Sequence, residues 1–390
     1  MSTPLPRHEF AASAGYVYLN HAAVGILPQS SRHAIEKLLR AHSDAGVLGT
    51  YPYDARMPEY RERIARFIGA RGSEIATVPS TSSGANVVAL GIDLQPGDEV
   101  LLCDNEFPAN AIPWLALRRR GVTVRLLPTQ YERLTPDRLR RELTPRTRAV
   151  AVSWVSYADG YRHDLRGLSE VAHAAQALLC VDAIQGLGAL RLDVREAGVD
   201  TLYAGAGKWM LGVHGIGLLY VHEDLIDRLK LPMPGWRSME DMWDFHAYDQ
   251  PYAAQAMRFE GGTPNIVGAL SLVESIDLFE RSGPAEIERH VLGLTDYLCD
   301  RLTHAGAVLL TPRGPGVSSG IVTFEMPGCD SVALGRRLQR EGVVTTYRAT
   351  GIRVAPHGYN TPEEIDRLVD LASAFTACDS NTAVLAGPDG

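Results

Sequence analysis

Lysine is almost absent from this chain, which has three lysines against thirty-five arginines. Lys37 and Lys230 lie in charged helical patterns and are expected at the surface. Lys208 instead ends the partly apolar run DTLYAGAGK, in a glycine-flanked turn. An amine held there can lose its hydration, which lowers its pKa and allows it to attack a carbonyl. Lys208 is therefore a candidate nucleophile, although an isolated loop lysine is more often a plain surface residue.

Basic clusters and long apolar stretches are also lacking. The formal net charge is −8, so neither nucleic acid nor an anionic membrane is an expected partner. No eighteen apolar residues run together, and MSTPLPRHEF has no basic region followed by an apolar one. We therefore expect a soluble, cytoplasmic protein. The five cysteines lack metal-ligand spacing, and neither a disulfide framework nor a metal site is predicted.

Apolar runs alternate with helical patterns through the first two thirds of the chain. Strands are expected at 99–104, 124–128, 149–155, 177–181, 200–206 and 215–221. Strands separated by helices predict a mainly parallel sheet with helices on both faces, an α/β fold. From about Ile266, long helical patterns lead to short strands, which predicts a smaller α+β domain. We divide the chain into an N-terminal arm (1–19), a large domain (20–258) and a small C-terminal domain (259–390).

Asp182 is the residue that favours a functional role for Lys208 over a surface one. It directly follows the apolar run 177–181, which is typical of a buried parallel strand. A carboxylate at the C-terminal end of such a strand faces the crevice where open α/β sheets bind ligands. Pyridoxal 5′-phosphate needs an acid at its ring nitrogen and a lysine that bonds to its aldehyde. A helix N-cap is the alternative role for Asp182, but it does not account for the pairing with Lys208.

With these motifs the chain resembles the class V aminotransferase-like enzymes of fold type I, which include cysteine desulfurases, isopenicillin N epimerase and kynureninase. The resemblance runs from YLNHAAVG, at Tyr18, to IRVAPHGYNT, at Thr361. It implies a mainly parallel seven-stranded sheet in the large domain, pyridoxal 5′-phosphate as cofactor and a small-molecule amino-acid substrate. It does not fix the reaction, because this family uses one cofactor for many chemistries.

The segment STSSGAN, residues 80–86, opens a helical pattern and is a candidate anion site. Such a start is often only a cap, but the resemblance implies that this one holds the cofactor phosphate. It nominates Ser82, with backbone donors from Ser83 and Gly84. Thr263 matches a threonine that reaches the phosphate from the neighbouring subunit, so the resemblance also implies a homodimer with a shared active site.

The segment before Lys208 departs from the family pattern. The family commonly has Ser-x-His-Lys, whose serine and histidine both contact phosphate, but this chain has Gly205 and Gly207. Two phosphate ligands are therefore missing. His214, six residues after the lysine, either compensates for them or is a loop histidine without a role.

Other matches surround the cofactor ring. Phe107 stands where desulfurases have a stacking histidine, so stacking is expected to persist without that acid. Gln185 matches the residue that bonds to the ring's 3-hydroxyl. Tyr157 is either a proton donor or a strand-end aromatic, and Asn110 either lines the pocket or forms a turn.

Arg353, in IRVAPHGYNT, matches the arginine that binds the substrate α-carboxylate. Its planar guanidinium would fix the carboxylate's orientation through two parallel hydrogen bonds. Further pocket residues are predicted from three segments: Asn20 and His21 in the arm, Arg348 and His357 near Arg353, and the loop 235–249.

The cysteine loop that desulfurases insert just before this arginine is missing. No cysteine lies between Cys329 and Cys378, so persulfide chemistry is not expected. With Lys208 as base at Cα, we predict β-elimination, including C–S cleavage of a cysteine conjugate. Epimerisation, transamination and decarboxylation-linked deamination stay open, as does a non-catalytic protein that only holds the cofactor.

Overall fold

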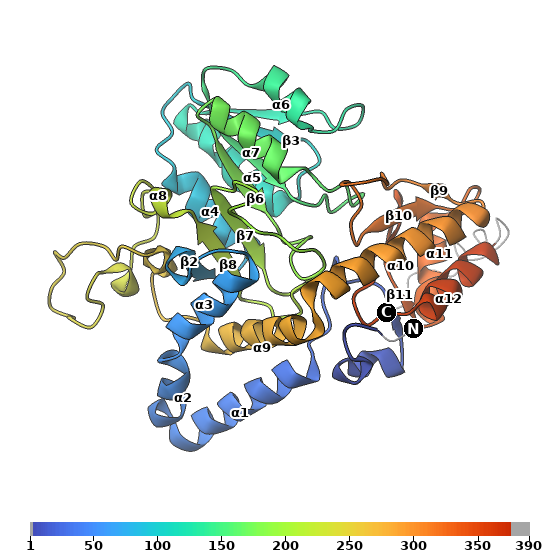
Figure 1. Ribbon diagram of the computed structural model, residues 1–390, viewed down its shortest axis with the longest axis horizontal. Helices are drawn as coiled ribbons and strands as arrows, with labels where there is room; N and C mark the ends of the chain where they lie inside the picture. Colours follow the sequence, from blue (N-terminus) through green and yellow to red (C-terminus); the bar gives the residue numbers. More distant parts are fainter. Residues whose placement is uncertain (1–2, 376–390) are drawn as a thin grey trace.

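The computed structural model describes residues 3–375. A seven-stranded sheet with strand order β2-β8-β7-β6-β5-β3-β4 forms its centre (Figure 1). The strands are β2 (Ile75–Val78), β3 (Glu99–Cys103), β4 (Thr123–Leu127), β5 (Thr147–Ser153), β6 (Leu178–Asp182), β7 (Thr201–Gly205) and β8 (Gly217–Val221). Only the pairs of β8 with β2 and with β7 are antiparallel. The predicted α/β fold with a mainly parallel seven-stranded sheet is confirmed.

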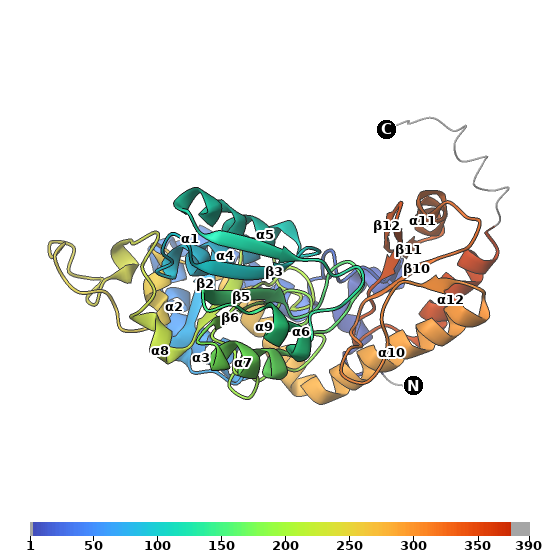
Figure 2. The same ribbon diagram turned by 90° about the horizontal axis from the view of Figure 1, so that it is seen from above.

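Helices cover both faces of this sheet (Figure 2). Alternate residues of one strand enter two separate hydrophobic cores: Leu179 and Val181 of β6 join one, and Cys180 joins the other. One face carries α4 (Thr81–Gly91) and α5 (Pro108–Leu115), and the other carries α3 (Met57–Phe67), α7 (Leu165–Ala174) and α9 (Ile266–Ser282). Burial on both faces explains why the strands are continuously apolar.

A second, four-stranded antiparallel sheet forms the smaller C-terminal part (Figure 1). Its order is β12 (Thr346–Arg348), β13 (Gly351–Val354), β10 (Val322–Glu325), β9 (Val308–Leu309), and its helices are α10 (Pro284–His304), α11 (Ser331–Arg340) and α12 (Pro362–Ser373). Gly283, with φ 80°, separates α10 from α9, and α9 packs against α3 and α1 (Gln29–Ala45) of the larger part. The domain boundary at 258/259 stays a prediction.

The N-terminal arm connects the two sheets. Its strand β1 (Val17–Tyr18) pairs with β11 (Val343–Val344), and Asn20 forms a bridge with Ala355. The chain that follows the arm then reaches the Lys208 turn, where the Gly25 N–H donates to the Gly207 carbonyl at 2.9 Å. The arm therefore holds the small sheet and the candidate nucleophile in a fixed relation.

The remaining elements are short. They are α2 (Val47–Asp54), α6 (Pro136–Glu142), α8 (Glu223–Ile226) and the 3₁₀ turns η1 (Arg7–Glu9), η2 (Ala11–Ala14), η3 (Gly72–Glu74), η4 (Ala116–Arg120), η5 (Trp236–Ser238) and η6 (Ala256–Glu260). Across residues 3–375, no helix has both the length and the apolar character needed to cross a membrane.

Candidate active site

Asp182 and Lys208 meet at one edge of the large sheet. Asp182 ends β6 and pairs in parallel with Tyr203 of β7, and Lys208 lies just beyond the end of β7. Burial raises the pKa of Asp182 to about 7, which the charge of Lys208 opposes. Burial lowers the pKa of Lys208 to about 8, opposed by Asp182 and assisted by Arg353. The structure thus brings together the predicted pair.

Backbone hydrogen bonds fix the turn that carries Lys208. Ala206 N–H donates to the Ile216 carbonyl at 2.9 Å, and Leu211 N–H donates to the Lys208 carbonyl at 3.0 Å. Leu211 has a φ of 55°, which is uncommon for a residue with a side chain. A Cβ at Gly25 would lie 2.1 Å from the Lys208 carbonyl oxygen, so only glycine lets the arm lie this close. The lysine backbone is therefore held from two sides.

An aromatic pair lies next to the lysine amine, with Phe107 as the ring that contacts it. Phe107, at the start of α5, has its ring centroid 5.3 Å from Lys208 Nζ, a cation–π distance. The Tyr157 ring meets Phe107 edge to face with centroids 5.1 Å apart. Phe107 therefore lies at the Lys208 amine, and Tyr157 lies against Phe107.

Arg353 projects from β13 toward the same place and is 8 % exposed. Among the described residues its guanidinium bonds only to the Tyr157 carbonyl at 2.8 Å and the Thr346 hydroxyl at 3.3 Å, while its buried Nε has no partner. Burial lowers its pKa to about 10, and Arg348 adds to the effect. A buried guanidinium is costly unless it is paired, so this arrangement favours an anionic ligand. Asn20 joins the group by accepting from Thr346 at 2.7 Å.

The turn before Arg353 is short. Arg348 of β12 pairs with Gly351 of β13, so two residues connect the strands. Cys329 lies elsewhere, in the loop before α11, where its thiol donates to the Phe375 carbonyl at 3.4 Å. Cys378 falls outside the described residues. Between β12 and β13 the structure thus has no loop of the kind that carries a desulfurase cysteine.

The start of α4 corrects part of the predicted phosphate site. The Ser83 N–H donates to the Ser80 hydroxyl at 3.1 Å, and the Gly84 N–H donates to the Ser80 carbonyl at 3.1 Å. Both predicted backbone donors are therefore already used inside the helix cap. The amides left for an anion are those of the first turn, Thr81 and Ser82. The Thr81 hydroxyl accepts from Gly205 N–H at 2.9 Å, which ties this helix end to the Lys208 turn.

Comparison with known proteins agrees with this geometry. The family model described as aminotransferase class-V matches residues 17–368. The uncharacterized aminotransferase YcbU of Bacillus subtilis is 31% identical over 81% of this chain and 83% of its own, and a probable cysteine desulfurase of Methanothermobacter thermautotrophicus is 29% identical over 94% and 96%. A solved complex of the cystine C–S lyase C-DES with cysteine persulfide superposes with TM-score 0.87 and 25% identity, covering 94% of this chain and 100% of that one.

The chain belongs to the class-V aminotransferase family. The family resemblance and the fold-type-I assignment made from the sequence are thereby confirmed. Pyridoxal 5′-phosphate is the cofactor of this family, and the side chains present here fit it. Asp182 offers a buried carboxyl, Lys208 an amine of lowered pKa, Phe107 a ring face and the start of α4 two amides.

The two glycines that break the class-V pattern have different neighbours. A Cβ at Gly207 would lie 3.0 Å from Nδ1 of His214, whereas a Cβ at Gly205 would meet the Thr81 hydroxyl at 3.3 Å. The His214 ring therefore occupies space that a side chain at 207 would need. Compensation by His214 stays a prediction, and the structure gives it a position beside the lysine turn.

Three residues predicted to contact the cofactor or the substrate are buried: Gln185, His21 and His357. Gln185 donates to the Ala22 carbonyl at 3.0 Å and accepts from the Trp209 indole at 2.9 Å, which uses two of the four bonds an amide can make. Its bond to the 3-hydroxyl stays a prediction. His21 and His357 are both 0 % exposed.

The two buried histidines form hydrogen bonds that hold neighbouring segments together. His21 Nδ1 donates to the Ala355 carbonyl and Nε2 accepts from the Tyr359 hydroxyl, both at 2.9 Å, and burial lowers its pKa. His357 accepts from Gly358 N–H through Nδ1 and donates through Nε2 to the Trp209 carbonyl. This packing corrects the predicted substrate contacts of both, because neither ring has exposed surface. They instead hold the arm and the residue after Lys208.

Glu106 is a site residue that the sequence argument missed. Its carboxylate accepts from Ser153 N–H at 2.8 Å, from the Ser153 hydroxyl and from Asn110 Nδ2 at 2.9 Å. Asn110 in turn accepts from the Tyr203 hydroxyl at 2.6 Å. Ser153 and Tyr203 are the strand neighbours of Asp182, and the Glu106 charge contributes to the raised pKa of Asp182. The sequence offered one indication of this role, because Glu106 lies between the predicted buried strand 99–104 and the predicted stacking residue Phe107.

Proposed function

We propose that this class-V enzyme is a lyase that eliminates a substituent from Cβ of an amino acid, such as the sulfur of a cysteine conjugate. The observation that carries the proposal is the convergence of Lys208, Asp182 and an uncompensated Arg353 beside a two-residue turn. We expect the short turn to leave room for a bulky Cβ group. The structural similarity to a cystine C–S lyase supports the same bond type.

Each residue has one task in this proposal. Bound pyridoxal phosphate supplies an electron sink for the bond broken at Cα. Asp182 would keep a proton at the ring nitrogen, and Phe107 would offer its ring face for stacking. Arg353 binds the α-carboxylate and orients the Cα–H bond. Lys208, whose pKa is about 8, accepts the Cα proton near neutral pH.

Tyr157 is the candidate donor for the departing group. Its ring contacts Phe107 and its carbonyl accepts from Arg353, the residue proposed to bind the α-carboxylate, which supports this role. The non-catalytic alternative is weakened by the joint presence of Lys208, Asp182, Gln185 and Arg353.

Product analysis with a panel of cysteine S-conjugates tests the proposal. We expect keto acid, ammonia and thiol in equal amounts. Recovery of the amino acid with inverted Cα would instead establish an epimerase, and a keto acid that retains its sulfur would establish an aminotransferase.

Two lysine variants provide the matched comparison for this assay. Lys208→Ala should yield no product and no covalently held cofactor, whereas Lys37→Ala, at an exposed helix position, should behave like the wild type. Full turnover by Lys208→Ala would remove the basis of the proposal.

A further inference from the structure

A second buried carboxylate, that of Glu106, is linked to the strands on both sides of Asp182. Ser153 of β5 and Tyr203 of β7 are the register partners of Asp182. Register partners on neighbouring strands project to the same face of a sheet, so these three side chains lie in a row. The Ser153 hydroxyl donates to Glu106. At the other end of the row, the Tyr203 hydroxyl donates to the Asn110 side chain at 2.6 Å, and the Asn110 amide donates to Glu106 at 2.9 Å.

The two carboxyl groups differ in the number of hydrogen bonds that they accept. Glu106 accepts three, from the Ser153 N–H at 2.8 Å, from the Ser153 hydroxyl and from Asn110. Asp182 accepts one among residues 3–375, from the Ile184 N–H at 2.9 Å. Donated hydrogen bonds favour the ionised form of a carboxyl, and two buried carboxylates close together do not both ionise readily. Glu106 therefore carries the negative charge, and Asp182 takes up the proton.

Few other charges act on this pair. Lys208, just beyond β7, favours the ionised form of Asp182, while the charge of Glu106 opposes it. Tyr203 and Cys103, at the ends of β7 and β3, are neutral neighbours, because burial raises the pKa of both. In the described part of the chain, the direct partners of Glu106 are hydrogen-bond donors without charge. Its negative charge is therefore not neutralised by contact and acts on Asp182.

We propose that Glu106 is a positioning residue whose fixed negative charge strengthens the hold of Asp182 on the proton that it shares with the ring nitrogen of pyridoxal phosphate. A protonated ring nitrogen makes the cofactor an electron sink, so the charge of Glu106 keeps the site competent to higher pH. The proposal rests on the assignment of Asp182 to the ring nitrogen, which is part of the proposed function. It does not depend on which bond is broken at Cβ.

Carbon-13 NMR of the full-length, cofactor-free protein tests the coupling, with label in the side-chain carboxyls of Asp and Glu. The signals of Asp182 and Glu106 are those absent from Asp182→Asn and from Glu106→Asp. In wild type, Glu106 should lose its proton at lower pH than Asp182. In Glu106→Gln, removal of the like charge should lower the titration midpoint of Asp182 by at least about one pH unit, roughly a tenfold loss of proton affinity.

Two substitutions at position 106 separate charge from shape. Glu106→Gln keeps the size and loses the charge, whereas Glu106→Asp keeps the charge and shortens the side chain. If the charge acts, Glu106→Asp should hold the proton affinity of Asp182 within about threefold of wild type. If only shape and hydrogen bonds mattered, Glu106→Asp would shift the midpoint more than Glu106→Gln does, which would overturn the proposal.

Glu99→Gln is the matched control. Glu99 is also buried and accepts from the Thr147 hydroxyl at 2.6 Å, but it begins β3, whereas Glu106 follows the end of that strand. Its substitution should leave the midpoint of Asp182 unchanged. Thermal unfolding of each variant verifies that it is folded.

Nitrogen-15 NMR of protein loaded with cofactor labelled at the ring nitrogen tests the effect on the cofactor. The ring nitrogen should lose its proton at a pH at least about one unit lower in Glu106→Gln than in wild type. The same pH dependence in both proteins, beside a shifted Asp182, would overturn the role toward the cofactor and would count against Asp182 as the partner of the ring nitrogen. Failure of the lyase assay alone would affect neither measurement.

Equal midpoints of Asp182 in wild type and Glu106→Gln would overturn the proposal. Loss of the Asp182 proton before that of Glu106 in wild type would overturn it as well. The second criterion does not need the glutamine variant, so it decides the matter even if Glu106→Gln does not fold.

Discussion

At the scale of single residues, burial favours the neutral forms of both the Asp182 carboxyl and the Lys208 amine. The pKa of the carboxyl is raised to about 7 and that of the amine is lowered to about 8, while each charge opposes the shift of the other. A pyridine nitrogen carrying a proton would restore a partner for the carboxylate. The protonation of the pair is therefore matched to a cationic ring and a neutral amine.

In cofactor-free protein, the shift of Asp182 makes stability depend on pH. Because its folded pKa, about 7, exceeds the ordinary value of 3.8, the folded state holds this proton more tightly. The contribution is complete below about pH 4 and lost as pH rises through 7, by up to about 4 kcal/mol. Urea unfolding at several pH values should show this fall in wild type relative to Asp182→Asn. Parallel curves for the two proteins would contradict the assignment.

Arg353→Lys tests carboxylate recognition. A lysine cannot form the two parallel bonds of a guanidinium, so KM for the amino-acid substrate should rise roughly 10- to 100-fold with a smaller change in kcat. Steady-state kinetics measures both constants, and Arg336→Lys, at an exposed position of α11, is the control. A KM equal to that of the control would exclude Arg353 as the carboxylate ligand.

At the scale of elements, the Lys208 turn is fixed by what lies against it. The arm contacts it through Gly25, α4 through the Thr81 hydroxyl, and the His214 ring fills the space beside Gly207. Glycine at 207 and histidine at 214 are therefore complementary. This explains how the turn can lack the family's usual side chain without a void at that point.

Gly207→Ala should disturb this fit. Its Cβ would lie 3.0 Å from His214 Nδ1, so the ring must move, and the cofactor dissociation constant should rise roughly tenfold. His214→Ala should weaken the cofactor as well if the ring holds phosphate, and the double variant should not recover. Absorbance titration with cofactor measures each constant, with Gly293→Ala, which has open space, as control. Recovery in the double variant would show that His214 does not hold phosphate.

Much of this arrangement follows from local sequence. Apolar runs ending in Asp182 and in the Lys208 turn place both groups at one sheet edge, because parallel strands share the direction of their carboxyl ends. The short edge strand β2 was not predicted, since four residues carry little pattern. The helix cap at α4, in which the Ser83 amide donates to the Ser80 hydroxyl, was one of the two roles left open for this segment.

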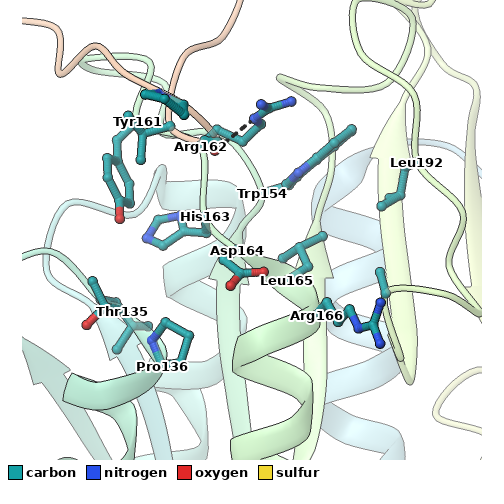
Figure 3. Close-up of a pocket in the computed structure, with 15 residues that line it drawn as sticks. Thr135, Pro136, Trp154, Tyr161, Arg162, His163, Asp164, Leu165, Arg166 and Leu192 are labelled. Carbon is teal, nitrogen blue, oxygen red and sulfur yellow. Dashed lines mark hydrogen bonds between the residues drawn. The ribbon is translucent and has the colours of Figure 1, made fainter.

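Other features depend on long-range packing that no local pattern records. His21 and His357 lie far apart in sequence and become buried only when the arm and the smaller part close on Trp209. Glu106 gains its partners from β5 and α5, and its partner Asn110 accepts in turn from Tyr203 of β7. For the same reason the pocket of about 420 Å³ lined by Trp154, His163 and Asp164 could not be predicted, because residues 315–317, between β9 and β10, also line it (Figure 3).

At the scale of the whole molecule, an aromatic loop projects from the large sheet (Figures 1 and 2). Residues from the segment 234–252 line an open pocket of about 710 Å³, and Trp243, Phe245 and Tyr248 of this segment are 55, 58 and 87 % exposed. Exposed apolar groups gathered in this way are typical of interaction surfaces. Thr263 is exposed as well, which fits the homodimer with a shared site that we propose.

Mixing two inactive variants tests the shared site. Lys208→Ala removes the nucleophile of a protomer's own site, and Thr263→Ala removes the residue predicted to serve the partner's site. Heterodimers formed after mixing should contain one intact site and regain activity and visible cofactor colour. Sedimentation should show a dimer or larger species. A mixture no more active than its parts, or a coloured monomer, would refute sharing.

The central claim is that a thiol-free site, with Lys208 as the base, breaks the bond at Cβ. Its most direct test is the intact-protein mass of the Cys329→Ala, Cys378→Ala double variant and of wild type during turnover of a cysteine S-conjugate. A nucleophile must approach its target to about 3–3.5 Å, and the two-residue β12–β13 turn carries no thiol to Arg353. We predict unchanged turnover and no added sulfur on either protein. A sulfur adduct on Cys329 or Cys378, with loss of turnover in the double variant, would contradict the account.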